Sequence, residues 1–176
     1  MNLPTREEAL RIMYETGCSQ RVINHCISVT EVALRIVQSF NRRGFDVDSD
    51  LVEVGAILHD LGRSKTHSVE HGSIGGRLAR EKGLPESLAR IIERHVGAGI
   101  TEEEAKKIGL PSGNYVPETL EEKIVSYADK IIEGDRQIDI ELTVEKFARE
   151  LGVDHPALDR LKALHGEIVD LIGQHF

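Results

Sequence analysis

The spacing of apolar residues along the chain is the feature that most constrains its fold. Between residues 22 and 40 they recur every three or four positions, as Val22, Ile23, Cys26, Val29, Ala33, Ile36, Val37 and Phe40. Such spacing places these side chains on one face of an α-helix, and similar runs follow in the rest of the chain. No segment alternates apolar and polar residues as a β-strand does, and no repeat recurs at a fixed period. The sequence therefore predicts an all-α fold.

Capping residues and glycines predict where the helices begin and end. The Thr-x-x-Glu pattern of a capping box occurs three times, beginning at Thr5, Thr101 and Thr119. Glycine commonly ends a helix, and Pro85 suits the first turn of one. These signals predict helices over about residues 6–16, 20–41, 50–61, 71–82, 85–96 and 120–131, with two more between 143 and 173. Residues 63–69 are polar and are predicted to form a loop.

The composition limits the class of protein. With 176 residues the chain has the size of one ordinary domain, and we expect a single domain over residues 1–176. Tryptophan is absent and aromatic residues make up 4%, so the core must be aliphatic. A net charge of -8 argues against general nucleic-acid binding and against binding to an anionic membrane surface, because both require a basic face.

The N-terminus and the cysteines indicate the compartment. Acidic residues stand where a secretory signal would be basic and then apolar, and no apolar run approaches the length of a membrane span. We therefore expect a cytoplasmic protein without membrane contact. Cys18 and Cys26 form no CxxC pair, and we expect both to be small buried apolar residues.

Histidine and aspartate side chains within these apolar helices need a chemical explanation. Both are weak helix formers, and an unpaired charge is costly to bury. A bound divalent cation would remove that cost, and imidazole with carboxylate suits Fe, Mn, Co, Ni or Zn. Taken alone, each histidine is more simply a hydrogen-bonded core or surface residue, but the adjacent pair His59 and Asp60 favours a metal site. The candidate ligands are His25, His59, Asp60, His71, His95 and Asp129.

The order of these residues resembles the HD-domain superfamily of metal-dependent phosphohydrolases. The motif of that superfamily is an isolated His, a His-Asp doublet at the end of an apolar helix followed by a Gly, and a distant Asp on a later helix. Here those are His25, the doublet within Ala56–Gly62, and Asp129 in the segment Ser-Tyr-Ala-Asp. The resemblance covers about residues 19–136 and implies an HD-domain helical bundle, with C-terminal helices over about 143–173.

Two further histidines are similar to those of the binuclear branch of this superfamily. They are His71, in His-Gly-Ser-Ile-Gly, and His95, in Glu-Arg-His-Val-Gly. The resemblance implies two divalent metal ions, with iron or manganese expected first and nickel, cobalt or zinc as alternatives. It also implies the ligand roles: one metal on His25, His59 and Asp129, the other on His71 and His95, and Asp60 bridging both. Residues 71–75 and 128–136 further resemble the di-iron hydrolases of diadenosine tetraphosphate.

A centre of this kind is suited to hydrolysis at phosphorus. Two cations lower the pKa of a water molecule between them and hold the attacking and leaving oxygens in line. The ligands bring only two negative charges, so the site stays electropositive and favours an anionic substrate. We therefore predict a phosphohydrolase that cleaves a phosphoester or phosphoanhydride bond in a small, nucleotide-like substrate.

Residues close in sequence to the ligands complete the predicted site. The predicted catalytic residues are Asp60, through its bridging position, Arg63 and Lys65. The predicted substrate-binding residues are Arg63, Lys65, His67, Lys130 and Arg136. For each of the four cations a solvated surface position is an equally good interpretation, and for His67 it is the simpler one. The candidates to accept the second ring N–H of a ligand histidine are Glu31, Glu70 and Glu93.

Two other classes of protein are compatible with the same ligands. A minority of HD proteins are di-iron oxygenases, which would depend on oxygen and release no phosphate. A non-catalytic regulator that binds a metal or nucleotide would have a degenerate site, whereas all six ligand positions are intact here. The sequence leaves open the substrate, the physiological metal and a homodimeric state.

Overall fold

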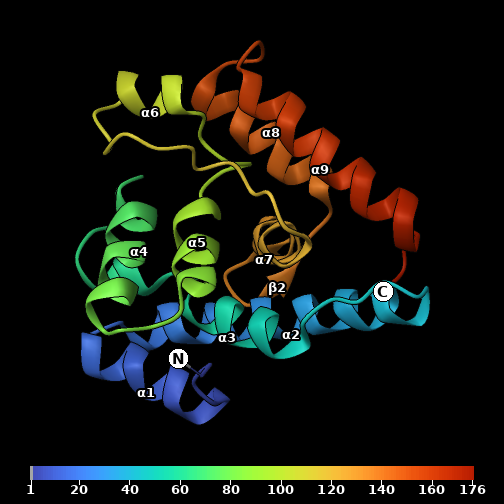
Figure 1. Ribbon diagram of the computed structural model, residues 1–176. Coiled ribbons are helices and arrows are strands. Elements are labelled where there is room, and N and C mark those ends of the chain that lie inside the picture. The colour runs from blue at the N-terminus through green and yellow to red at the C-terminus, as the bar shows by residue number, and fades with distance from the viewer. Residues whose placement is uncertain (1) are drawn as a thin grey trace.

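The computed structural model describes residues 2–176, and its regular secondary structure is almost entirely helical (Figure 1). The elements are α1 (Arg6–Thr16), α2 (Gln20–Arg42), α3 (Ser49–Leu58), the 3-10 helix η1 (Leu61–Ser64), α4 (His71–Glu81), α5 (Glu86–Arg94), α6 (Glu102–Lys107), α7 (Leu120–Lys130), β1 (Ile132–Glu133), β2 (Arg136–Gln137), α8 (Ile140–Leu151) and α9 (Pro156–Ile172). The two strands pair antiparallel as a short hairpin. This architecture confirms the predicted all-α fold.

The ends of the helices follow the predicted local signals. Thr5 and Glu8 make the two reciprocal bonds of a capping box at α1, and the boxes at α6 and α7 form in the same way. After α1 comes Gly17, whose φ of 95° lies in the left-handed region that glycine tolerates. Ser19 and Asp48 accept backbone N–H groups at the starts of α2 and α3. Local chemistry thus sets these boundaries.

The segment after α3 differs from the prediction. α3 ends at Leu58 rather than at Gly62, and the 3-10 helix η1 forms where the sequence predicts a turn into a loop. A Cβ on Gly62 would lie 2.8 Å from the backbone nitrogen of Gly75 and would overlap the carbonyl of His71. Gly62 therefore permits η1 to pack closely against α4 instead of ending a helix.

Two further differences are smaller. α5 begins at Glu86 with Pro85 as its N-cap, whereas the sequence predicts Pro85 as the first helical residue. The β1–β2 hairpin is not predicted, because each strand has two residues and too few positions for a period to be recognised. Gly134 in its turn has a φ of 63°, a conformation that favours glycine.

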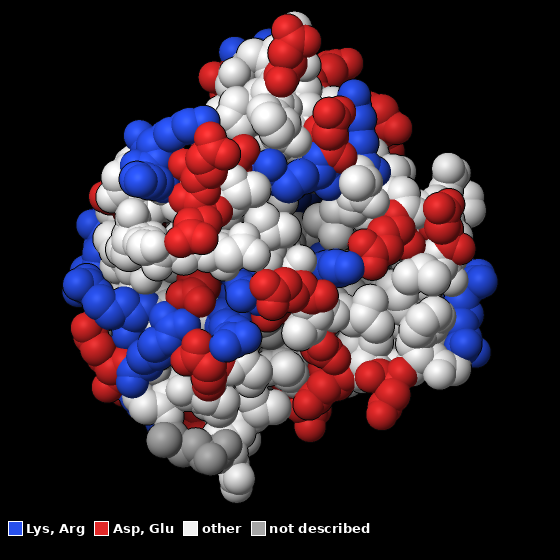
Figure 2. Space-filling model, turned by 45° about the horizontal axis from the view of Figure 1, so that its top comes forward, with Lys and Arg blue, Asp and Glu red and all other residues white. Residues whose placement is uncertain are grey.

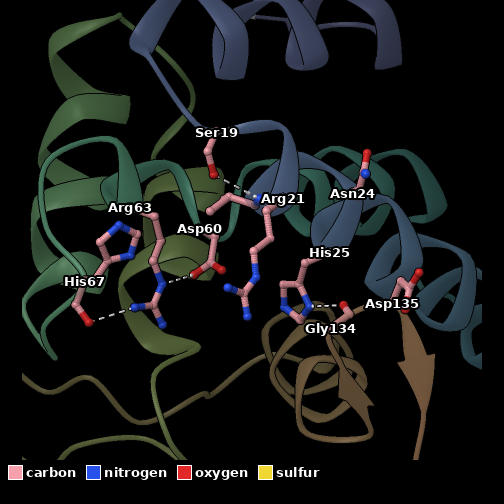
Figure 3. Close-up of a pocket in the computed structure, with 10 residues that line it drawn as sticks. Ser19, Arg21, Asn24, His25, Asp60, Arg63, His67, Gly134 and Asp135 are labelled. Atoms are coloured by element: carbon pink, nitrogen blue, oxygen red, sulfur yellow. Dashed lines mark hydrogen bonds and ion pairs between the residues drawn. The ribbon is translucent and has the colours of Figure 1, made fainter.

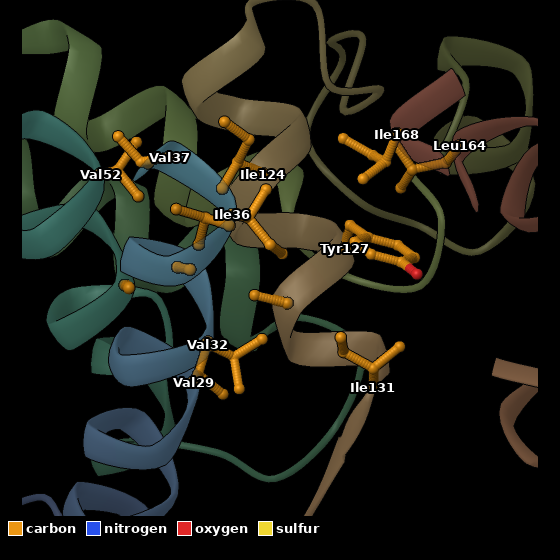
Figure 4. Packing of buried hydrophobic residues seen from close by; sticks show 14 of the residues in the cluster. Val29, Val32, Ile36, Val37, Val52, Ile124, Tyr127, Ile131, Leu164 and Ile168 are labelled. Carbon is orange, nitrogen blue, oxygen red and sulfur yellow. The ribbon is translucent and has the colours of Figure 1, made fainter. Parts of the chain in front are cut away.

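The core is aliphatic, as the composition predicts, and its largest part lies between α2, α7 and α9 (Figure 4). The side chains that meet there include Val29, Val32, Ile36, Ile124, Tyr127, Ile131, Leu164 and Ile168. A second apolar cluster joins α1, α3 and α5 and includes Met13, Ile57, Leu58 and Ile92. Packing of α2 against α7 brings His25 and Asp129 within hydrogen-bonding distance of each other.

Charged side chains of both signs are mixed over the surface shown in Figure 2, where Lys and Arg are interspersed with Asp and Glu. This mixture accompanies a net charge of -8. Within residues 2–176, no helix combines the length and the apolar character needed to cross a lipid bilayer.

Candidate metal centre

The structure brings the six predicted ligand residues together. Their ligand atoms form two groups of three, and within each group these atoms lie within 4.8 Å of one another. The first group is His25, His59 and Asp129, and the second is Asp60, His71 and His95. Residues of the second group are buried, and so is His59, whereas His25 and Asp129 are partly exposed.

Helix ends supply most of these residues. His59 caps the C-terminus of α3 and Asp60 follows it, His71 opens α4, and His95 caps the C-terminus of α5. The four meet because η1 and α4 pack together and α5 packs against both α3 and α4. The remaining two lie within α2 and in the last turn of α7.

Each histidine ring is oriented by a backbone carbonyl. Nδ1 of His59, His71 and His95 donates to the carbonyl three residues earlier, at 2.7, 2.7 and 2.6 Å. Nδ1 of His25 donates to the carbonyl of Gly134 in the β1–β2 turn at 2.8 Å. A carbonyl can only accept, so Nδ1 carries the proton of each neutral ring and Nε2 keeps a free lone pair.

The glutamates predicted to orient the histidines do not do so. Glu70 is the hydrogen-bond partner of Ser68, and Glu93 pairs with Arg80. The acceptors are main-chain carbonyls instead, as is frequent for metal-binding histidines. A carbonyl is present at every residue and has no sequence signature, so pattern analysis could not have found them.

In the first group, one carboxylate oxygen faces both imidazoles. Oδ1 of Asp129 lies 2.9 Å from Nε2 of His25 and 3.4 Å from Nε2 of His59. The ammonium group of Lys130 contacts the other oxygen, Oδ2, at 2.5 Å and donates to the carbonyl of His95 at 2.9 Å. Lys130 therefore fixes the orientation of the Asp129 carboxylate and joins the end of α7 to the end of α5.

In the second group, the carboxylate of Asp60 lies between the two sets of histidines. Its Oδ1 is 3.3 Å from Nε2 of His71 and 3.4 Å from Nε2 of His95. Its Oδ2 is 3.7 Å from Nε2 of His59, a member of the first group. One oxygen of Asp60 thus faces each group.

The electrostatics favour ionised carboxylates and neutral imidazole at His95. Burial raises the pKa of Asp60, but the surrounding histidines, His59 above all, outweigh it and hold that pKa well below its usual value. Burial also raises the pKa of Asp129, but the ammonium group of Lys130, more than any other neighbour, outweighs it. The pKa of Asp129 is therefore also well below the usual value. Burial lowers the pKa of His95 to about 4, so its ring is neutral at pH 7.

These side chains fit a divalent cation. Nε2 of His59 is buried and has no hydrogen-bond partner within residues 2–176, a costly arrangement that a cation bound to that nitrogen would relieve. Imidazole nitrogens with carboxylate oxygens suit iron, manganese and related ions. Cys26 lies within reach of His59 and Asp60, but burial raises the pKa of its thiol, which disfavours a thiolate ligand.

Three cavities adjoin these residues. The first, which we call the Arg21 cavity, has a volume of about 740 Å³ and is lined by Arg21, Arg63 and His67 beside His25 and Asp60. The central cavity, of about 540 Å³, contains ligand residues of both groups together with Lys130 and Phe147. The apolar cavity, of about 390 Å³, extends from His71 along Val96, Ile100, Ile108, Phe147 and Leu151.

The predicted substrate-binding residues divide into two sets. Arg63 and His67 line all three cavities, and Lys130 lines the central one. Lys65 and Arg136 are exposed, and neither is among the described residues that line these cavities. The first set therefore lies beside the six candidate ligands, and the second does not.

One residue at the site was missed by sequence reasoning. Arg21 lies one helical turn before His25 on α2, and Figure 3 shows its guanidinium group between Asp60 and His25. Residues four apart share a helix face, so a basic residue at this spacing before a ligand histidine is the signal that could have found it.

Comparisons with known proteins agree with this geometry. Residues 22–133 match the family model of the HD domain. The chain is 46% identical over 166 residues to an uncharacterized protein of Methanocaldococcus jannaschii, covering 94% of this chain and 98% of that protein. It is 38% identical over 172 residues to the tRNA (cytidine(56)-2'-O)-methyltransferase of Thermoplasma volcanium, covering 98% of this chain and 49% of the methyltransferase. The chain thus spans about half the length of that second relative.

A solved structure shares the fold. The HD domain of the L. monocytogenes phosphodiesterase PgpH, in complex with cyclic-di-AMP, matches with a TM-score of 0.58 and 13% sequence identity. The match covers 96% of this chain and 99% of that domain. At this low identity the likeness concerns the arrangement of the helices.

Proposed function

The chain belongs to the HD domain family, and we propose that it is a two-metal phosphohydrolase that acts on a small, nucleotide-like phosphoester or phosphoanhydride. The observation that carries the proposal is the Asp60 carboxylate, with one oxygen toward each group of histidines. We assign one metal to His25, His59 and Asp129, the other to His71 and His95, and Asp60 to both. Iron and manganese are the first candidates for this donor set, with nickel, cobalt and zinc as alternatives.

Two divalent cations held here would supply the Lewis acidity that activates water and stabilises charge on phosphoryl oxygens. Arg63 uses Nε to hold Asp60 at 3.3 Å and Nη1 to hold the carbonyl of His67 at 2.8 Å. A guanidinium has five N–H groups, so the others stay free to bind a phosphoryl oxygen. Arg63 would therefore both orient the bridging carboxylate and bind substrate.

The other predicted cations take different parts in this proposal. Lys130 is buried and engaged with Asp129 and the carbonyl of His95, so we assign it a positioning role rather than contact with substrate. We do not include the exposed Lys65 and Arg136 in the site. Neither is among the described residues that line the three cavities.

The nucleotide-like character of the substrate is supported by the apolar cavity. It begins at His71 and continues along the Phe147 ring, and an aromatic ring with aliphatic neighbours offers a surface on which a nucleobase can stack. The fold neighbour PgpH is a phosphodiesterase that was captured with a cyclic dinucleotide. We therefore place the nucleoside part of the substrate on this side of the ligands.

The experiment that tests the function is reconstitution followed by a screen for phosphate or nucleotide release. Metal-free protein is loaded anaerobically with Fe²⁺ or Mn²⁺ and incubated with AMP, short dinucleotides, diadenosine tetraphosphate and p-nitrophenyl phosphate. We expect hydrolysis of at least one of these by wild type and none by Asp60→Ala, which lacks the shared ligand. Oxygen consumption with an organic substrate, in protein that hydrolyses nothing on the panel, would establish the oxygenase instead.

A second candidate substrate is RNA. The Thermoplasma volcanium relative, to which nearly all of this chain aligns, is named a tRNA methyltransferase. The net charge of -8 and the mixed charges of Figure 2 disfavour a long RNA, because binding many phosphates requires a basic surface. A length series from dinucleotide to 20-nucleotide RNA decides between them, because kcat/KM that rises with length favours RNA and kcat/KM that falls favours the small substrate.

A further inference from the structure

The cavities on the two sides of the six candidate ligands are lined by different kinds of side chain. On the side of α2 and η1 lies the Arg21 cavity, which is lined by arginines from both of these elements, Arg21 and Arg63. On the side of α8 lies the apolar cavity, with Phe147 and aliphatic neighbours. Both cavities reach the ligands, and Arg63 and His67 line both. A substrate whose reacting phosphorus lies at the ligands can therefore extend in two chemically different directions.

Arg21 is a basic residue of the Arg21 cavity that has no side-chain partner among the described residues. Its guanidinium makes no hydrogen bond or ion pair with any other residue between 2 and 176, whereas Arg63 is held by Asp60 and His67. In Figure 3 it extends from α2 alongside His25 toward Asp60. Its five N–H donors are thus free within the cavity, next to where the reacting phosphoryl group would lie.

Two anionic groups line this cavity. Asp60 pairs with Arg63 at 3.3 Å, but as the proposed bridging ligand its charge would be shared with two cations when these are bound. Asp135, in the β1–β2 turn, also lines the cavity, but Figure 3 shows it on the other side of His25 from Arg21. With cations bound to Asp60, which lies between the two arginines in Figure 3, the charge around Arg21 and Arg63 would be positive, and their planar donors suit the oxygens of a phosphate.

Building on the function proposed above, we infer that Arg21 and Arg63 form a subsite for a second phosphate of the substrate, distinct from the phosphate that is hydrolysed. The substrate class is then a nucleotide that carries two separate phosphates, such as a 5'-phosphorylated dinucleotide or a nucleoside bisphosphate. The nucleoside lies toward the apolar cavity, and the phosphate that is not attacked lies in the Arg21 cavity. Arg21 is a specificity-determining residue in this arrangement.

Matched substrates that differ by one phosphate test the subsite. The first pair is the dinucleotide ApA and its 5'-phosphorylated form pApA, and the second is AMP and adenosine 3',5'-bisphosphate. The kcat and KM of each are measured with metal-loaded wild type, Arg21→Ala and Arg21→Lys, and metal content is recorded for every sample. Arg21 is chosen over Arg63 because Arg63 contacts Asp60, and its removal would also disturb a proposed ligand.

The control variant is Arg11→Ala. Arg11 is an exposed arginine on α1, with a single distant ion pair to Glu15 at 3.9 Å, and it lines none of the described cavities. It loses the same charge from the protein, so a general effect of net charge on an anionic substrate would appear in both variants. A fall in kcat/KM that occurs in Arg21→Ala and not in Arg11→Ala therefore reports on the Arg21 cavity itself.

We expect wild type to prefer the doubly phosphorylated member of whichever pair it hydrolyses. Loss of a charge-assisted phosphate contact should lower kcat/KM for that member by about 10- to 100-fold in Arg21→Ala, mainly through KM. The singly phosphorylated member should change by less than about 2-fold, Arg21→Lys should recover part of the loss, and metal content should not change.

Four results would overturn the inference, and they are distinguishable. Wild type that hydrolyses both members of a pair equally well, or Arg21→Ala that weakens both alike, contradicts the subsite while the proposed function stands. Metal-loaded wild type that hydrolyses no member of either pair, and nothing on the broader panel, contradicts the proposed function and the subsite with it. Hydrolysis of p-nitrophenyl phosphate alone contradicts the subsite only.

Discussion

Nε2 of His71 lies 3.0 Å from Nε2 of His95, and when both rings are neutral their hydrogen bonds at Nδ1 leave these two atoms without a proton. The protons are on Nδ1, donated to the carbonyls of Ser68 and Ile92. Two lone pairs that face each other at this distance repel, unless a cation lies between them. Two nitrogens bound at right angles to a metal at about 2.1 Å are themselves about 3.0 Å apart. The pair is therefore spaced as two ligands of one ion.

Metal removal should destabilise the protein measurably. Without a cation the facing nitrogens of neutral His71 and His95 repel, and Nε2 of His59 stays buried with no hydrogen-bond partner among residues 2–176. Metal in 100-fold excess over its Kd contributes about 2.7 kcal/mol, which for a chain of this size is a rise in Tm of roughly 5–10 °C. Differential scanning calorimetry after chelation and after reloading measures it. A Tm that is the same in both states would show that these residues bind no metal.

Gly62→Ala should disrupt the candidate metal centre, although Gly62 is not one of its six candidate ligands. A side chain there would overlap the carbonyl of His71 and approach Gly75, so η1 would be pushed from α4 and His71 displaced. We expect destabilisation of about 2 kcal/mol or more and loss of the metal that His71 holds. The matched control is Gly166→Ala in α9, where nothing lies within 4 Å of the added Cβ and the fold should be slightly stabilised. Equal denaturant midpoints for the two variants would contradict the packing argument.

Glu122→Ala should destabilise the packing of α7 against α5. The buried guanidinium of Arg94 bonds to both oxygens of Glu122, at 3.2 and 2.9 Å, one residue before His95. Removing one partner of a buried ion pair costs about 3–5 kcal/mol. Here the lower end is expected, because Glu118 also contacts Arg94 at 3.0 Å. Glu118→Ala, which removes the exposed partner, should cost less than about 1 kcal/mol in urea unfolding. A larger loss of unfolding free energy in Glu118→Ala than in Glu122→Ala would contradict the assignment of Glu122 as the main partner of Arg94.

The two cysteines should be unreactive in the folded protein. Burial raises the pKa of Cys18 to about 11 and also raises that of Cys26. At pH 8 only about 0.1% of Cys18 would be thiolate, the form that reacts. A chromogenic disulfide reagent should modify two thiols in denatured protein and none in native protein over the same minutes. Rapid modification of native protein would mean that this part of the core is open.

Local sequence signals predicted the helices well because their causes are local. The capping boxes at Thr5, Thr101 and Thr119 act within four residues and formed as predicted. The break after Leu58 was not predicted, because it depends on close packing of Gly62 against α4, a contact between segments distant along the chain. Gly62 was expected to end a helix, and only the tertiary structure shows what it permits.

The candidate ligands could be predicted because a metal site needs particular side chains in a particular order. All six lie together in two groups, although no single one stood out from its own neighbours. The groups that surround the ligands were harder to predict. Main-chain carbonyls that orient the rings have no side-chain signature, and Gly134 supplies one of them from an unpredicted hairpin. Arg21 looks like any surface arginine until α2 is placed beside η1.

Metal stoichiometry tests the central claim most directly. Metal-free protein is titrated with Mn²⁺ or, anaerobically, with Fe²⁺, and bound metal is measured by elemental analysis for wild type, His71→Ala and the control His67→Ala. His67 lines the central and apolar cavities together with His71, but it lies outside both groups of ligands. We predict about two metals per chain for wild type and His67→Ala, and about one for His71→Ala. One metal per chain in wild type, or two in His71→Ala, would contradict a two-metal centre bridged by Asp60.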